Sequence, residues 1–264
     1  MTKRKAVTNS LKYNIFYKSI SLLSITVSLL IWFLISKLTT LGEIFLPSPI
    51  KVFEKFISDI TNLQTLNYIF VTLVESAFGS IIGAFIGVAL ALTVYKSVIA
   101  DKAIHPFIAM SQSIPAIALA PVLVLWIGYG LISIIILCTL IVFFPIFIST
   151  LTGFKTIDKE VIEAAKLDGA TGIKLIAEIE FPLAIPNFLS GLRNGFTLSI
   201  TGAIVGEMVM GGNGLGTLLT VYRNNLDIVG MFSTIIILCV LSLLIYQLLL
   251  FFERKSKIML SLIP

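Results

Sequence analysis

The longest uncharged stretch of the chain is residues 103–154, which read AIHPFIAMSQSIPAIALAPVLVLWIGYGLISIIILCTLIVFFPIFISTLTGF. These 52 residues contain no Lys, Arg, Asp or Glu. A helix needs about 20 apolar residues to cross a bilayer, so the stretch has room for two spans. We expect these spans at Ile104–Ile127 and Leu131–Thr150, with a turn at Gly128-Tyr129-Gly130 between them.

The composition of the whole chain is also that of a membrane protein. Of its 264 residues, 57% are hydrophobic and only 12% are charged, and the mean hydropathy is +1.04. A soluble domain carries about 25% charged residues, so this composition excludes a water-soluble enzyme, a disordered chain and a secreted disulfide scaffold. The pI near 9.2 indicates no nucleic-acid partner, because the Lys and Arg residues flank apolar runs instead of clustering together.

Four further apolar stretches are long enough to be spans, at Ser19–Ile35, Tyr68–Val94, Phe188–Met210 and Gly230–Phe252. The first is longer than the core of a signal peptide, about 7–15 residues, so we expect it to be retained. Because lipid cannot satisfy an open sheet edge, the expected fold is all-α, with about six transmembrane helices. The expected parts are an N-terminal segment 1–18, one transmembrane domain 19–252 and a tail 253–264.

The distribution of basic residues predicts the orientation of these spans. With the N-terminus in the cytoplasm, the basic residues outside are Lys37, Lys51, Lys55 and Arg223, and the other 15 of the 19 lie inside. Cytoplasmic loops of membrane proteins carry the excess of Lys and Arg. We therefore expect both termini to lie in the cytoplasm.

Two outer segments have recognisable local patterns. Ser48 suits the N-cap of a helix and Pro49 its first position. Apolar residues then recur at helical spacing (Phe53, Phe56, Ile57 and Ile60), which predicts a short amphipathic helix that either packs on the bundle or docks a partner. The glycine-rich residues 211–216 are expected to form a flexible turn into the last span rather than a ligand site.

The chain contains no motif for a cofactor or for catalysis. It has no Walker A, HExxH, GxSxG or paired CxxC pattern. Cys138 and Cys239 lie inside apolar runs, where a thiol behaves as a small hydrophobe, and the single His105 cannot form a metal site alone. We expect this chain to bind no cofactor or metal itself, so any ATP and Mg²⁺ must be held by another chain.

The long inner segment, residues 151–187, has its own helix signals. Asp158 can cap a helix over Lys159–Leu167, and Gly169 can end it in a left-handed conformation. A second stretch, Gly172–Glu180, is expected to end at Phe181-Pro182, because proline disfavours helix in the residue before it. Small residues in the last turn of the first helix allow another surface to approach closely.

The same segment carries a family pattern. Glu163-Ala164-Ala165, Gly169 and Ile179-Glu180-Phe181-Pro182 follow the spacing EAA, three residues, G, nine residues, I-x-L-P, with Phe181 in place of leucine. This pattern resembles that of the membrane permease subunits of binding-protein-dependent ABC importers. Further stretches resemble the nitrate, sulfonate and taurine type permeases, namely residues 46–49, 113–121, 126–130, 144–146 and 205–207. The resemblance runs from Leu46 to the end of the last span.

The resemblance implies a role and a set of partners. It implies a coupling helix that contacts a cytoplasmic ABC ATPase through Glu163, Ala164, Ala165, Asp168, Gly169 and Pro182. It also implies a soluble extracytoplasmic binding protein, a second permease chain, expected as a homodimer, and a lipid environment in the inner membrane of a bacterial cell. The chain would then be no enzyme, because ATP and Mg²⁺ belong to the ATPase.

Polar residues within the spans are candidates for the translocation pathway, because intramembrane charges usually face a bundle interior or a cavity. The candidates are Glu75, Gln112, Ser113, Asn194, Thr197, Thr201 and Glu207. Four of them share one helical face with Arg193, namely Asn194, Thr197, Thr201 and Glu207. Hydrogen bonding between helices is the alternative explanation for this face. The carboxylate of Glu75, where relatives often have a basic residue, favours a cationic or neutral solute. Alternatively, Glu75 lies at the membrane edge or pairs with Arg193.

Two other functions compete with that of a permease subunit. In a secondary transporter driven by an ion gradient, Glu75 and Glu207 would relay protons or bind sodium. However, the chain has no convincing internal repeat, and a secondary transporter has no ATPase for the coupling pattern to contact. A membrane enzyme would need clustered acid, base or metal ligands, which the sequence lacks.

The resemblance allows oxyanions and sulfonates, or vitamins and their pyrimidine precursors, as substrates, and residues 126–146 are slightly closer to the vitamin type.

Overall fold

The computed structural model describes residues 20, 23–38, 45–111 and 115–260, and every regular element in these ranges is a helix. An apolar helix, Leu23–Leu38, comes first. The others are α3 (Pro49–Thr61), α4 (Leu63–Lys96), α5 (Val98–Ser111), the 3-10 turn η1 (Ala116–Ala118), α6 (Leu119–Ile127), α7 (Leu131–Lys155), α8 (Lys159–Leu167), α9 (Gly172–Leu175), the π-helical turn η2 (Ile176–Glu180), α10 (Phe181–Met210), α11 (Leu215–Asn224) and α12 (Ile228–Leu260). The all-α prediction is confirmed.

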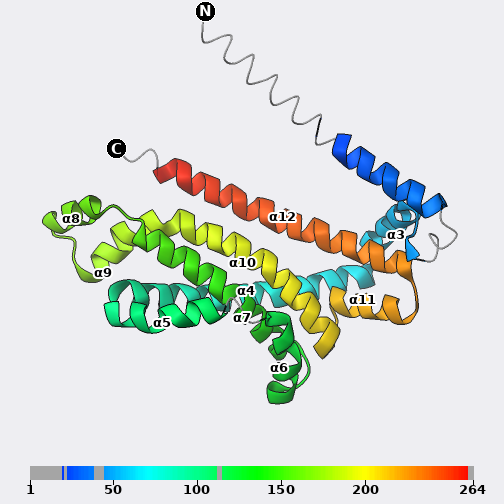
Figure 1. Cartoon of the computed structure of the whole chain (residues 1–264), viewed down its shortest axis with the longest axis horizontal. Helices are drawn as coiled ribbons and strands as arrows, with labels where there is room; N and C mark the ends of the chain where they lie inside the picture. Colours follow the sequence, from blue (N-terminus) through cyan, green and yellow to red (C-terminus); the bar gives the residue numbers. More distant parts are fainter. Residues whose placement is uncertain (1–19, 21–22, 39–44, 112–114, 261–264) are drawn as a thin grey trace, which may run out of the picture.

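Four helical stretches of the described chain are long and apolar enough to cross a membrane. They are α4, α7, the continuous helix Gly172–Met210 that ends in α10, and Ile228–Ser256 of α12. These stretches contain four of the predicted spans and lie along the long axis of the molecule (Figure 1). Of the first predicted span, Ser19–Ile35, residues 23–35 lie in the apolar helix Leu23–Leu38, and residues 19 and 21–22 lie outside the described part.

The predicted span Ile104–Ile127 is interrupted in the structure. The chain forms α5, then η1 and α6, and residues 112–114 between them lie outside the described part. Pro115 explains the break, because proline donates no backbone hydrogen bond and disfavours helix in the residue before it. As a result, α6 leaves the direction of α5 and points away from the bundle (Figure 1).

The central helix is α7, which packs between α4 and α10. Glycines make this close packing possible: Gly79, Gly83 and Gly87 of α4 all face α7. A Cβ atom at Gly83 would lie 3.0 Å from the carbonyl oxygen of Thr139. On the other side of α7, α10 presents Gly191, Gly195, Gly202 and Gly206. The α4 glycines are four positions apart, and the α10 glycines form two pairs with the same spacing. Small residues at this spacing let transmembrane helices approach closely.

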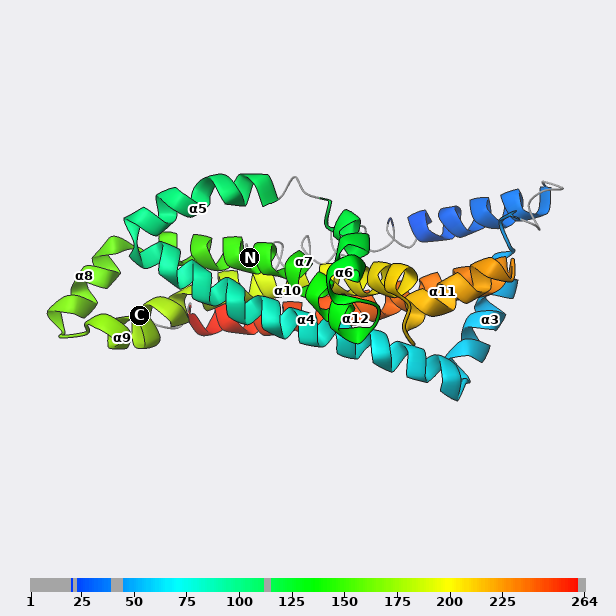
Figure 2. The same cartoon turned by 90° about the horizontal axis from the view of Figure 1, so that it is seen from below.

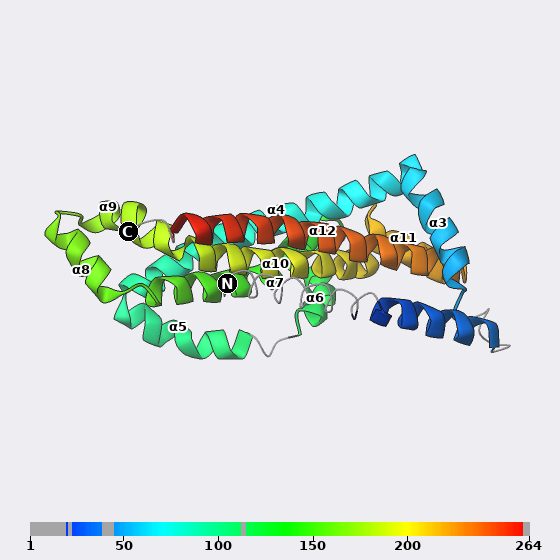
Figure 3. The same ribbon diagram turned by 90° about the horizontal axis from the view of Figure 1, so that it is seen from above.

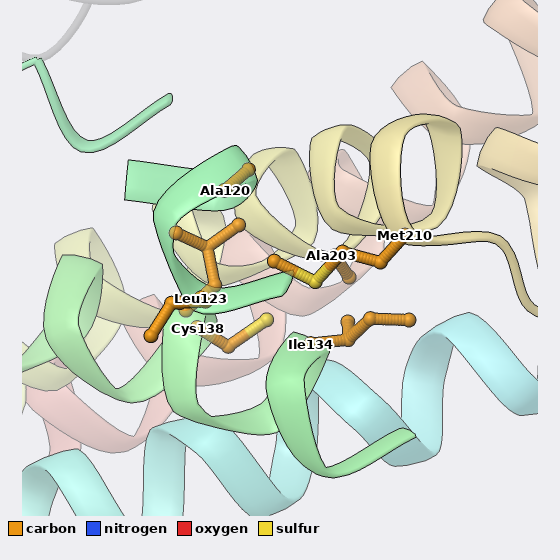
Figure 4. Close-up of a cluster of buried hydrophobic side chains, with 7 residues drawn as sticks. Ala120, Leu123, Ile134, Cys138, Ala203 and Met210 are labelled. Atoms are coloured by element: carbon orange, nitrogen blue, oxygen red, sulfur yellow. The ribbon is translucent and has the colours of Figure 1, made fainter. Parts of the chain in front are cut away.

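A hydrophobic cluster joins α6 to the two helices α7 and α10. Its members are Ala120, Leu123, Ile134, Leu137, Cys138, Ala203 and Met210 (Figure 4). The Sγ atom of Cys138 lies 3.5 Å from the carbonyl oxygen of Ser199. Cys138 therefore behaves as the expected small hydrophobe, whereas Cys239 is exposed on α12.

The two ends of the bundle differ. The short helices α8 and α9 lie at one end, together with the C-terminal end of α12, and α3 and α11 lie at the opposite end (Figures 2 and 3). The predicted inner and outer segments are therefore separated by the length of the bundle. Helix α12 continues past Phe252, the expected end of the last span, to Leu260.

Candidate functional site

The coupling-loop helix α8 forms as its sequence predicts. The side chain of Asp158 caps it by accepting a hydrogen bond of 3.1 Å from the backbone N–H of Glu160. At its end, Gly169 has φ +87°, and the N–H of Ala170 donates to the carbonyl oxygen of Ala165 at 2.9 Å. This is the arrangement of a glycine-terminated helix, so both predicted ends are confirmed.

Helix α8 stands free of the bundle, because none of its residues is buried. Its apolar side chains are open as well: Leu167 is 89% exposed and Val161 is 44% exposed. The candidate coupling residues Glu163, Ala164, Asp168 and Gly169 are exposed, and Ala165 is half-buried. An isolated helix of this length is marginal in water, so an unpacked helix with apolar side chains is suited to bind a partner surface.

A cavity of about 510 Å³ lies between α8 and the adjacent ends of α4 and α7. It is lined by Tyr95, Lys96, Phe154, Lys155, Ile157, Lys159, Ile162, Glu163, Lys166 and Glu180. Two ion pairs border the cavity, and they differ in burial. Lys155 and Asp101 pair at 2.8 Å with both side chains exposed, whereas Lys96 pairs at 2.6 Å with Glu180, whose side chain is 2% exposed.

Glu180 is a functional candidate that the sequence analysis missed. Its carboxylate accepts hydrogen bonds from Lys96 Nζ and, at 3.3 Å, from Tyr95 Oη. We call Tyr95, Lys96 and Glu180 the inner anchor, because they fasten the segment after α8 to the end of α4. Glu180 lies inside the family pattern, but its partner Lys96 lies 84 residues earlier in the chain. In the sequence, Lys96 is informative only as one of the basic residues that predict the orientation of the spans.

The prediction that the second inner helix ends at Phe181-Pro182 is wrong. The helix passes through these residues into α10 by the π-helical turn η2, in which the N–H of Phe181 donates to the carbonyl oxygen of Ile176. A wider turn accommodates Pro182, which has no N–H to donate. The candidate coupling residue Pro182 is therefore half-buried at the start of α10, and the loop is continuous with a membrane span.

Two adjoining hollows form a groove along α10 and α12, with volumes of about 440 and 490 Å³. Thr197 and Tyr246 line both of them, Thr201 and Cys239 line the first, and Asn194 lines the second. We call this the α10 groove. It brings together three of the pathway candidates, Asn194, Thr197 and Thr201, on one wall.

Arg193 lies next to the α10 groove but is engaged by α12. Its Nε atom is 3.2 Å from Glu253 Oε2, and its Nη1 atom donates to Tyr246 Oη at 2.8 Å. Both members of this ion pair are largely buried. The alternative that Arg193 pairs with Glu75 is therefore wrong.

Glu207 lies elsewhere, at the outer end of α10, where three helices meet. Its Oε1 atom accepts a hydrogen bond of 2.7 Å from Thr72 Oγ1 of α4, and its Oε2 atom accepts one from the N–H of Gly216 in α11. Thr72 Oγ1 in turn accepts from the N–H of Leu215 at 2.8 Å. Glu207 thus places both carboxyl oxygens as hydrogen-bond acceptors at the N-terminus of α11, where the backbone N–H groups are free to donate.

The expectation of a flexible turn into the last span at residues 211–216 is wrong. The segment leads into α11 and lies tightly over Glu207. A Cβ atom at Gly214 would overlap the Glu207 carboxylate, and one at Gly216 would lie 2.9 Å from Glu207 Cβ. Only glycine leaves room at these positions for the carboxylate beneath the backbone.

Glu75 is buried in the same region. Its side chain, which is 1% exposed, contacts the Glu207 carboxyl group. We call Thr72, Glu75, Glu207 and residues 214–217 the outer junction. The pathway candidates are thus divided: Glu75 and Glu207 are absent from the lining of the α10 groove, and Gln112 and Ser113 lie outside the described residues.

The amphipathic helix α3 forms as predicted, with Ser48 at its N-cap, and it packs on α12. Buried Asp59 accepts a hydrogen bond of 2.6 Å from Ser233 of α12 and pairs with Lys55 at 2.9 Å. Burial lowers the pKa of Lys55, but the hydrogen bonds and charges of Asp59 and Tyr222 raise it by more, so the net shift is upward.

Residues 79–258 match the family model described as binding-protein-dependent transport system inner membrane component. The chain is 40% identical over 154 residues to the riboflavin transport system permease protein RibX of Chloroflexus aurantiacus, a match that covers 58% of each protein. It is 34% identical to the formylaminopyrimidine transport permease protein ThiX of Halalkalibacterium halodurans, over 75% of this chain and 79% of that protein. A chain of the MetNI methionine ABC transporter, inward facing, has the same fold with a TM-score of 0.66 at 20% identity, over 73% of this chain and 96% of that one.

Proposed function

Because the chain belongs to the family of binding-protein-dependent transport system inner membrane components, we propose that α8 docks on the partner ATPase and that the α10 groove forms one wall of the substrate pathway. Members of the family are the transmembrane permease subunits of ABC importers. The chain is therefore a multi-pass membrane protein without ATPase activity of its own, and it works with a separate ATPase and a substrate-binding protein.

The exposure of α8 is the observation that carries the docking proposal. A helix without one buried residue, whose Leu167 side chain is 89% exposed, is stable in this position only if another surface covers it. We assign the docking contacts to Val161, Glu163, Ala164, Leu167 and Asp168, and we assign ATP and Mg²⁺ to the ATPase alone. Pro182 acts differently, by joining the loop to α10.

Copurification of the ATPase with the permease tests the docking proposal. Ala164→Asp and Leu167→Asp change exposed side chains, so they leave the permease folded but place a carboxylate in the contact. The matched control is Lys174→Asp, an exposed position on α9. We expect both α8 variants to lose the ATPase and uptake together, whereas the control keeps both. Full copurification and uptake in Leu167→Asp would show that α8 is not the docking helix.

The α10 groove supports the pathway proposal because it combines polar side chains with membrane depth. One chain supplies only one wall, so we propose that a second copy of the chain supplies the facing wall in a homodimer. The helix Leu23–Leu38 supports this arrangement, because nearly all of its apolar side chains are exposed and need a partner chain or lipid to cover them.

A tryptophan in the groove tests the pathway proposal. Thr197→Trp would fill space that both hollows share, so uptake should fall while the ATPase still copurifies. Leu244→Trp, at a position of α12 that is 59% exposed, is the matched control and should transport normally. Normal uptake by Thr197→Trp would place the pathway elsewhere.

The orientation and the substrate class are also proposals. We propose that the α8 end faces the cytoplasm, because most Lys and Arg residues lie on that side in the predicted topology. We propose a nitrogen heterocycle of the vitamin or pyrimidine-precursor class as substrate, because both sequence relatives named above are permeases for such compounds. Labelling of a cysteine at position 166 tests the orientation, and binding measurements on the cognate binding protein test the substrate.

A further inference from the structure

Two acidic side chains, Glu75 and Glu207, face each other inside the outer junction. Each is 1% exposed, and their carboxyl groups are close enough for a hydrogen bond between them. A charged group within a membrane is costly unless it has a partner, and two adjacent carboxylates repel each other. The pair therefore needs something that removes one of its two negative charges.

No cationic side chain does so in the described part of the chain. Glu207 is the charged neighbour of Glu75, and the facing helix α7 contributes Cys138, whose thiol lies near both carboxyl groups. Arg193, the basic residue of α10, is paired with Glu253 instead. The other residues that α4 and α11 add to the outer junction are uncharged.

The hydrogen-bond donors around the pair are distributed unequally. Glu207 accepts from Thr72 Oγ1 and from the N–H of Gly216, at the N-terminus of α11. These donors stabilise an ionised carboxylate. Glu75 has no such donors, and its Oε2 atom has no hydrogen-bond partner among the described residues. An unpartnered carbonyl oxygen of a neutral acid is far less costly to bury than an ionised oxygen.

We propose that Glu75 and Glu207 share one proton, which Glu75 carries and donates in a hydrogen bond to the ionised Glu207 carboxylate. Hydrogen bonds between a donor and a carboxylate are among the strong ones. The proton thus converts a repulsive pair into a link between α4 and α10, while Glu207 continues to cap α11. The outer junction is therefore a proton-binding site, in which Glu75 carries the proton and Glu207 accepts the hydrogen bond.

This assignment predicts opposite effects of two chemically identical substitutions. Glu75→Gln keeps a donor, because its amide N–H replaces the carboxyl O–H, and it removes the need for the proton. Glu207→Gln loses an acceptor, because one of its two oxygens, each of which accepts a hydrogen bond, becomes an amide group that donates. The midpoint of thermal unfolding should be unchanged in the first variant and shifted downward in the second.

Infrared spectroscopy of the assembled transporter, permease with ATPase, tests the proton directly. At neutral pH the wild type should show the C=O stretching band of a buried protonated carboxyl group, and Glu75→Gln should lose this band. The exposed variant Glu54→Gln, in α3, is the matched control and should keep it. A wild type without this band, or its persistence in Glu75→Gln, would refute the proposal.

The pH dependence of thermal stability gives a second, independent readout. Alkaline conditions remove the shared proton and leave two adjacent carboxylates, so the wild type should lose stability at high pH more steeply than Glu75→Gln. The comparison is made in a Cys138→Ala background, because the Cys138 thiol lies near both carboxyl groups and its own titration would otherwise differ between the two proteins. Equal pH profiles, or a Glu75→Gln variant as unstable as Glu207→Gln, would overturn the assignment. A dependence on sodium concentration in place of pH would show that the pair binds a cation instead.

Discussion

Removal of the lysine of the inner anchor should destabilise the permease, because it leaves a buried carboxylate without its cation. In Lys96→Met, Glu180 loses the ammonium group 2.6 Å away and keeps only Tyr95 Oη at 3.3 Å. Methionine preserves most of the length and packing of the lysine stem. The substitution therefore tests the ion pair rather than the volume of the side chain.

The magnitude follows from the burial of the two partners. Breaking a fully buried ion pair by removing one member costs about 3–5 kcal/mol. Here Glu180 is 2% exposed but Lys96 is 41% exposed, so solvent already screens part of the attraction. We therefore expect Lys96→Met to lower the free energy of unfolding by about 1–3 kcal/mol, the cost of leaving a buried polar group without its hydrogen bond.

The second ion pair bordering the same cavity provides a matched control. Lys155 and Asp101 are 45% and 37% exposed, so Lys155→Met should cost only about 0–1 kcal/mol. The double variant Lys96→Met with Glu180→Gln should recover part of the loss, because the neutral amide no longer needs a cation. Double-mutant cycles separate this pairwise contribution from the effects of the single substitutions.

Thermal unfolding of the purified transporter complex at neutral pH measures these differences, and stimulation of the ATPase by the loaded binding protein measures coupling. We expect Lys96→Met to lower both the unfolding midpoint and the stimulation, and Lys155→Met to change neither appreciably. Equal effects of the two lysine substitutions, or no recovery in the double variant, would refute the reasoning from burial.

Three further outcomes follow from other contacts. Gly216→Ala places a Cβ atom against the backbone carbonyl oxygen of Ile204 and 2.9 Å from Glu207 Cβ, so it should lower the midpoint of thermal unfolding by an amount corresponding to about 1–3 kcal/mol. Gly169→Ala meets no neighbouring atom but imposes φ +87° on alanine, so the turn after α8 should be strained by about 1–2 kcal/mol. The amount of copurified ATPase should therefore fall only in part. Because the pKa of Lys55 is raised above 10.5, its contribution to stability is complete at neutral pH. It should be lost only as the pH rises through the raised value, which an alkaline stability profile of wild type against Lys55→Met measures.

Local patterns in the sequence predicted the elements whose cause is local. The Asp158 cap, the Gly169 stop and the Ser48-Pro49 start all appear as predicted, because each depends on a few neighbouring residues. The same holds for the four long spans, since crossing a bilayer is a property of one continuous segment.

Prolines account for two of the differences between sequence and structure, because the effect of a proline depends on what surrounds it. Pro115 lies at the break between α5 and α6, whereas Pro182 is accommodated by a π-helical turn in a helix that continues. Neighbouring helices and local turns can compensate for a proline within a membrane, so sequence alone does not decide between a break and a continuous helix.

The contacts of the outer junction were not predictable, because they join residues that are distant in the chain. Thr72 and Glu207 are 135 positions apart, and their pairing depends on how α4 and α10 pack on either side of α7. The rows of glycines on α4 and α10 were a signal that the sequence analysis overlooked. On α4 they are spaced four residues apart, which indicates the face that meets α7, and Glu75 lies on that face, four residues before Gly79.

Helix α4 connects the two ends of the molecule that matter for transport. Lys96 at its last turn holds the coupling segment through Glu180, and Thr72 and Glu75 hold the outer junction. At a rise of about 1.5 Å per residue, Glu75 and Lys96 are separated by about 30 Å, the thickness of the hydrocarbon layer. Its sequence contains no proline, and its glycines pack tightly against α7, so α4 has no evident point at which to bend. A displacement of α8 by the ATPase would therefore reach the outer junction as a movement of α4 as a whole, because the inner anchor joins them.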